Sequence, residues 1–85
     1  MLKDYRKKLD RIDTEIVKLL KKREDVIKKV GRYKKKIGLK ICDPKREKEL
    51  IKDKLKMAGR LNKKFVESIF RLILKESKRK QKEAE

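Results

Sequence analysis

The feature that most constrains this chain is a row of apolar side chains, spaced alternately three and four residues apart over residues 2–37. Ten of the eleven positions are apolar or aromatic and the remaining one is an arginine: Leu2, Tyr5, Leu9, Ile12, Ile16, Leu19, Arg23, Val26, Val30, Tyr33 and Ile37. That spacing places them all on one side of a long amphipathic helix. A guanidinium in such a row is costly unless an anion or acidic partner meets it. Arg23 therefore marks a candidate binding site.

The length of this helix predicts a second chain. The helix over 2–37 should end at Gly38, and at about 1.5 Å per residue it would be roughly 54 Å long. A compact globule of this chain length is only about 30 Å across. The helix overshoots such a fold, so we expect an intertwined homodimer with paired long helices. A continuous two-stranded coiled coil is the simpler alternative.

Two shorter helices are predicted downstream from their capping residues. Asp43 is a favourable N-cap and Pro44 is tolerated at the first helical position, so a second helix is expected over about 44–58. Asn62 is a favourable N-cap for a third helix over about 63–82. With three glycines and one proline in 85 residues, the predicted fold class is all-α and residues 1–85 form a single domain.

Composition limits the partners and the chemistry. A net charge of +17 attracts anions of any kind, including nucleic acids, acidic membranes and carboxylated metabolites. Cys42 is the only cysteine and there is no histidine, so we expect no disulfide, no metal site and a reducing, cytoplasmic location. No signal peptide or membrane span is recognised. The excess of Lys and Glu over Gln and Asn is typical of thermophiles.

Polar residues interrupt the apolar rows of all three predicted helices. Arg23 and Lys34 are eleven residues apart, close to three turns, so they point the same way about 16 Å apart along the axis. Glu47 shares a face with apolar residues of the second helix, and Ser77 and Gln81 continue the row of the third. A cavity lined by these side chains would suit a small polyanion that bears a hydroxyl.

Each of these residues also has a structural explanation. Arg23 could form an ion pair with Glu47 or another carboxylate, and Lys34 could be one more solvated lysine of the surface. Glu47 could be an exposed first-turn acid favoured by the helix dipole. Ser77 and Gln81 could simply mark where burial ends along the third helix.

In their order along the chain, these residues resemble the chorismate mutases of the all-helical bacterial and archaeal type. The resemblance is carried by R-K-K-L-D-R-I-D (6–13), L-L-K-K-R (19–23), V-G-R-Y-K (30–34), D-P-K-R-E (43–47) and I-F-R-L-I-L-K-E-S-K-R-K-Q (69–81). It implies an intertwined homodimer with two equivalent active sites. It also implies conversion of chorismate to prephenate, a step towards phenylalanine and tyrosine, without a cofactor.

The same resemblance assigns the residues that bind the substrate carboxylates. Arg6 of the partner chain and Arg23 would clamp the two carboxylates, with Arg46 and Ser77 assisting. The spacing within one helix independently requires that Arg6 act in trans. Arg6 and Arg23 are about 25 Å apart along the axis and roughly 100° apart around it, so one straight helix cannot aim both at one small molecule.

The remaining residues would act at the ether oxygen and the ring hydroxyl. By resemblance, Lys34 would hydrogen-bond a carboxylate and the ether oxygen, and Gln81 would donate to that same oxygen. Glu47, with the backbone near Asp43, would bind the hydroxyl. Because the rearrangement is pericyclic, it requires neither a nucleophile nor a metal.

Three other functions remain open from the sequence. An isochorismate pyruvate lyase would share the fold and the clamp, although Glu47 favours the mutase. A basic helical nucleic-acid-binding protein would suit the charge. However, the chain has only four aromatic residues for stacking and its basic residues are spread over all the helices. A structural coiled-coil adaptor would have no small-molecule pocket. We expect neither a nucleic-acid nor a membrane partner.

Overall fold

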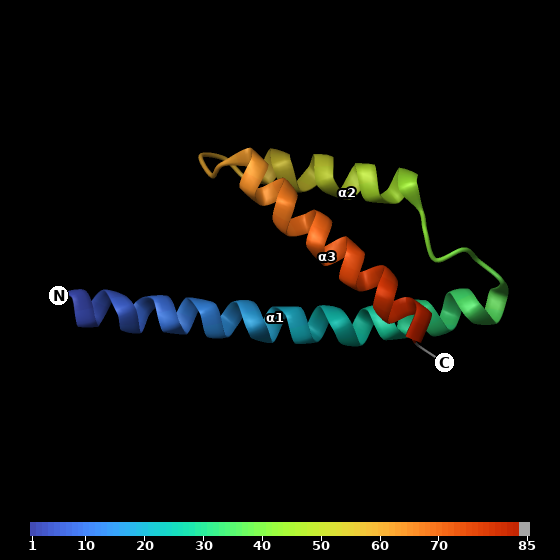
Figure 1. The fold of residues 1–85 in the computed structure, drawn as a ribbon, viewed down its shortest axis with the longest axis horizontal. Helices are drawn as coiled ribbons and strands as arrows, with labels where there is room; N and C mark the ends of the chain where they lie inside the picture. The colour runs from blue at the N-terminus through green and yellow to red at the C-terminus, as the bar shows by residue number, and fades with distance from the viewer. Residues whose placement is uncertain (84–85) are drawn as a thin grey trace.

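The computed structural model describes residues 1–83 as three α-helices joined by two short connections (Figure 1). The helices are α1 (Leu2–Ile37), α2 (Pro44–Met57) and α3 (Lys63–Glu83). These bounds agree with the predicted ranges to within one residue at each end. No strand occurs within residues 1–83, so the predicted all-α class is confirmed.

Each helix begins or ends at a residue whose chemistry explains the boundary. Gly38 ends α1 in the left-handed conformation (φ 75°), which glycine adopts without steric cost. The Asp43 carboxylate accepts a hydrogen bond from the backbone N–H of Arg46, 3.1 Å away, and so caps the first turn of α2. The side-chain oxygen of Asn62 caps α3 in the same way, accepting from the N–H of Phe65 at 3.0 Å.

The third helix connects the other two. In Figure 1, α3 runs diagonally from the end of α2 to the C-terminal half of α1, and it packs against both. The backbones of α1 and α2 do not approach each other closely. The longest dimension of the chain is 55 Å, and the N-terminal end of α1 projects beyond the other helices (Figure 1).

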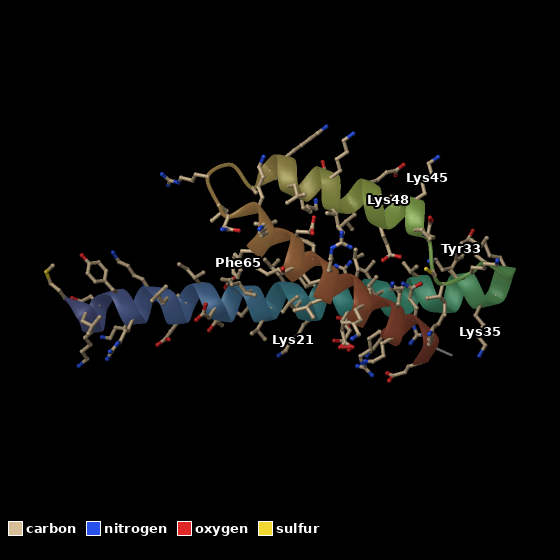
Figure 2. All side chains as sticks on the ribbon, turned by 45° about the horizontal axis from the view of Figure 1, so that its top comes forward. Lys21, Tyr33, Lys35, Lys45, Lys48 and Phe65 are labelled. Atoms are coloured by element: carbon tan, nitrogen blue, oxygen red, sulfur yellow. The ribbon has the colours of Figure 1, made fainter. Side chains whose placement is uncertain are left out.

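Most of the predicted apolar row lies uncovered in the single chain. The buried apolar side chains are few: Ile51, Ala58 and Val66. Half or more of the surface of each of these α1 side chains is exposed: Leu2, Tyr5, Leu9, Ile12, Ile16 and Leu19. Figure 2 shows side chains spreading from this part of α1 with no other segment over them. Such a continuous apolar surface is typical of an interaction site.

Neither a membrane span nor a cluster of metal-binding side chains is found within residues 1–83. No described helix combines the length and the apolar character that crossing a bilayer would need. No group of three or more His, Cys, Asp or Glu side chains that could hold a metal ion lies in this part of the chain.

Replacing the α3 cap should destabilise the fold without touching the pocket described below. Asn62→Ala removes the acceptor of the Phe65 N–H, and lost N-caps cost about 1 kcal/mol. For a domain of this size, that corresponds to a fall of about 4–8 °C in the thermal midpoint. Asn62→Asp keeps an acceptor and should stay near the wild-type midpoint. Equal losses in both variants, measured by circular dichroism, would contradict the capping role.

Candidate active site

A pocket of about 490 Å³ is lined by all three helices and by the connection between α1 and α2. Seven of the eight residues predicted from the sequence contribute to its lining: Arg23, Lys34, Asp43, Arg46, Glu47, Ser77 and Gln81. Its walls are completed by aliphatic side chains of α1, α2 and α3. Arg6 is exposed near the N-terminus of α1 and does not line this pocket. A single chain therefore brings together every predicted residue except the one expected from a partner.

Arg23 reaches α3 instead of a carboxylate. Its Nη1 donates a hydrogen bond to the hydroxyl of Ser77, and that hydroxyl donates to the backbone oxygen of Ile73 at 2.7 Å. Arg23 has no acidic partner within residues 1–83, so the alternative of a structural ion pair with Glu47 is wrong. A guanidinium carries five N–H donors, so most of them remain available to a bound anion.

Keeping Arg23 protonated in this position costs the fold free energy. Burial lowers the pKa of the Arg23 guanidinium below its usual value, and the nearby charge of Arg46 lowers it further. A lowered pKa means that folding disfavours the protonated form, although arginine stays protonated at neutral pH. An anion placed between Arg23 and Arg46 would offset both effects by its attraction to the two guanidinium groups.

Lys34 joins the end of α1 to the connection that follows it. Its ammonium donates to the backbone oxygen of Ile41 at 3.0 Å, and the residue is half-buried. Lys34 therefore differs from lysines such as Lys21 and Lys35, which Figure 2 shows on the side of α1 away from α2. An ammonium has three donors, so Lys34 retains two for a ligand.

The most buried polar side chains of the described chain are those of Ser77 and Gln81, which are 6% and 7% exposed. The alternative that they mark the end of burial is therefore wrong. The Gln81 Oε1 atom is buried and has no hydrogen-bond partner within residues 1–83. Leaving a buried amide oxygen unpaired is costly, so Gln81 Oε1 requires a partner such as an ordered water or a ligand in the pocket.

Glu47 is held from two sides. Its Oε1 atom accepts from the ammonium of Lys78 at 3.2 Å, and its Oε2 atom faces the sulfur of Cys42 at 3.7 Å. A thiol is a weak donor, so Oε2 is the freer oxygen. The Asp43 carboxylate is already occupied as the cap of α2, which leaves its backbone as the group to meet a ligand.

Lys22 and Lys78 line the pocket but were not predicted from the sequence. Lys78 precedes Gln81 by three residues, and this spacing places both on one face of α3. Among 31 lysines and arginines, however, nothing in the sequence distinguishes these two from solvated ones.

The side chains of the pocket can bind an anionic ligand and polarise it. Five cationic side chains face two carboxylates: Lys22, Arg23, Lys34, Arg46 and Lys78 against Asp43 and Glu47. A small dicarboxylate fits this charge balance, and the aliphatic walls can pack against its apolar part. No nucleophile paired with a base is found among the described lining residues, so the pocket can hold, bend and polarise an anion.

Comparison with known proteins agrees with this pocket. The family model for chorismate mutase type II matches residues 5–82, so the chain belongs to this family, and the resemblance found in the sequence is confirmed. It is 42% identical over 69 residues to a bifunctional chorismate mutase/prephenate dehydratase of Aquifex aeolicus, covering 81% of this chain and 18% of that protein. It is 45% identical over 47 residues to a chorismate mutase of Methanocaldococcus jannaschii, covering 55% of this chain and 48% of that protein.

These matches thus span less than half of the length of either relative. No solved structure matches the chain significantly. The family assignment consequently rests on the family model and on the two relatives.

Removing the charge of Arg23 should weaken anion binding without lowering the stability of the fold. We expect Arg23→Met to keep or raise the thermal midpoint, because the substitution removes a charge that is partly buried and lies near the charge of Arg46. Malonate, a small dicarboxylate, should stabilise the wild type by about 1.4 kcal/mol at ten times its dissociation constant. Arg23→Met should lose this stabilisation, whereas Arg60→Met, at an exposed position between α2 and α3, should keep it.

The measurement is a thermal melt with and without malonate at constant ionic strength. Equal malonate effects in the wild type and in Arg23→Met would show that the anion binds elsewhere.

Proposed function

We propose that this protein is a chorismate mutase, which rearranges chorismate to prephenate in the synthesis of phenylalanine and tyrosine. The observation that carries the proposal is the convergence of Arg23, Lys34 and the buried side chain of Gln81 on one pocket of a family member. We also propose a cytoplasmic location, as expected for an enzyme of primary metabolism with a single exposed cysteine.

The first contribution to the rate is conformational. Chorismate carries a flexible enolpyruvyl side chain and two carboxylates. Arg23 and Arg6 of the partner chain would hold the two carboxylates so that the enolpyruvyl side chain lies over the ring. Arg46 lines the same pocket, and Ser77 keeps the guanidinium of Arg23 in place through its hydroxyl. Fixing two reacting ends in an attack geometry removes much of the entropic barrier.

The second contribution is electrostatic. As the C–O bond breaks, negative charge grows on the ether oxygen, and Lys34 and the amide N–H of Gln81 would donate to it. Donors aimed at developing charge are worth roughly 3–4 kcal/mol each. A rate enhancement of ~10⁶ requires about 8 kcal/mol, so two donors and the clamp suffice in order of magnitude.

Glu47 would recognise the ring hydroxyl, together with the backbone near Asp43. Within the described residues 1–83, the one donor to its Oε2 atom is the weak thiol of Cys42, so this oxygen can accept a stronger hydrogen bond from a substrate. A carboxylate in a pocket of cations also repels misplaced substrate carboxylates, which favours one orientation of chorismate.

The working unit of this proposal is a homodimer in which Arg6 enters the partner's pocket. The uncovered apolar row on α1 supports pairing of long helices, because a small buried core leaves the single chain with little to stabilise it. Arg6 lies on this same exposed end of α1. The substrate is chorismate, and no metal, cofactor or nucleic acid takes part.

Replacing Lys34 should abolish turnover and leave the assembly intact. Lys34→Ala removes a donor from the ether oxygen, for which a loss of about 10²–10³-fold in kcat is expected. The measurement is the loss of chorismate absorbance, with size-exclusion chromatography to verify the dimer. Lys35→Ala, next to it and exposed, is the matched control. Wild-type turnover in the Lys34→Ala variant would refute the role of Lys34. Release of pyruvate from isochorismate by the wild-type protein would indicate the lyase instead of the mutase.

Mixing two inactive variants should restore activity if Arg6 acts in trans. Arg6→Ala and Lys34→Ala homodimers each have two defective sites. A mixed dimer has one site that carries both defects and one that carries neither. After refolding together at equal amounts, about half of the dimers are mixed, so we expect about a quarter of wild-type activity. A mixture as inactive as its components would show that Arg6 serves its own chain.

A further inference from the structure

We propose that Lys78 is a positioning residue that tethers Glu47. The tethered carboxylate can then bind the substrate hydroxyl and stays away from the arginines that hold the substrate carboxylates. The inference rests on the function proposed above. It concerns a residue that the sequence did not single out.

The tether spans two helices at the pocket wall. Lys78 lies on α3 between Ser77 and Gln81, and Glu47 lies in the first turn of α2. The ammonium of Lys78 is 3.2 Å from Glu47 Oε1, and the two side chains are 37% and 24% exposed. Both line the pocket that holds Arg23 and Lys34. The tether therefore fixes one oxygen of Glu47 and leaves Oε2 for a ligand.

Stability alone does not account for this contact. Partly exposed ion pairs contribute little to folding, because solvent screens them and two long side chains lose freedom. The other ion pairs of α3 include contacts within the helix itself, such as Arg71 with Glu67, and these touch no part of this pocket. The distinctive property of the Lys78–Glu47 pair is its place at the substrate pocket.

An untethered Glu47 would compete with the substrate. The pocket holds Arg23, Lys34 and Arg46, all suited to bind carboxylates, and among residues 1–83 Arg23 has no acidic partner. A free carboxylate beside these cations would be drawn to them and would occupy the place of a substrate carboxylate. Lys78 supplies the competing cation and keeps the clamp open.

The kinetic effect should appear mainly in KM. No bond to the ring hydroxyl forms or breaks in the reaction. A hydrogen bond to this hydroxyl therefore stabilises the ground state and the transition state alike. We expect Lys78→Met, of similar length but neutral, to raise KM about tenfold, the scale of one charge-assisted hydrogen bond, with kcat changed less than about threefold. The thermal midpoint should stay unchanged within about 2 °C.

The matched control is Lys75→Met. Lys75 is an exposed lysine on the same helix and lies outside this pocket, so its replacement makes the same change in net charge. Its KM should stay within about twofold of wild type. Lys78→Arg keeps a cation for Glu47 and should restore most of the lost affinity. Equal KM values in Lys78→Met and Lys75→Met would overturn the proposal.

A double variant tests whether Lys78 acts through Glu47. If it does, Lys78→Met should raise KM about tenfold in the wild type but hardly at all in a Glu47→Gln background. Multiplying effects would instead show that Lys78 acts on the substrate by its own charge, which contradicts the tether. Wild-type protein that fails to turn over chorismate would refute the proposed function, and the role of Lys78 with it. If the wild type turns over normally but the effects of the two substitutions on KM multiply, only the role of Lys78 is refuted.

Discussion

The crossing of α3 over α1 is the contact on which the site depends, and polar side chains make up much of it. Arg23 of α1 donates to Ser77 of α3, and Glu24, the next residue of α1, pairs at 3.0 Å with Lys80, three residues after Ser77 on α3. The hydrogen bond to Glu24 raises the pKa of Lys80, so the ammonium remains protonated in this contact. Because these contacts have directional geometry, the crossing fixes where Gln81 meets the pocket more closely than apolar packing would.

The sequence predicted those features that arise from local chemistry. Capping side chains at Asp43 and Asn62 define helix starts whatever the tertiary structure, so the helix bounds were accessible. Arg23 and Gln81 were also accessible, because a polar residue in an apolar row is conspicuous against its periodicity.

Other features depend on contacts between helices and could not be predicted. The partner of Glu47 is Lys78, 31 residues away in the sequence, and only the fold decides which of many lysines lies opposite. The hydrogen bond from Arg23 to Ser77 likewise depends on the angle at which α3 crosses α1. Arg6 is exposed in the single chain and lies outside the pocket, so the role proposed for it requires a second chain.

The hydrogen bond from Lys34 to the carbonyl of Ile41 has a consequence for motion. It fastens the connection between α1 and α2 to a side chain that also belongs to the pocket, so the order of that segment and the occupancy of the pocket are thermodynamically linked. An ammonium shared between a backbone carbonyl and a bound carboxylate would hold the segment more firmly than either partner alone. Ligand release would then loosen the main chain around Ile41, and the enzyme would open at its connection while the long helix stayed rigid.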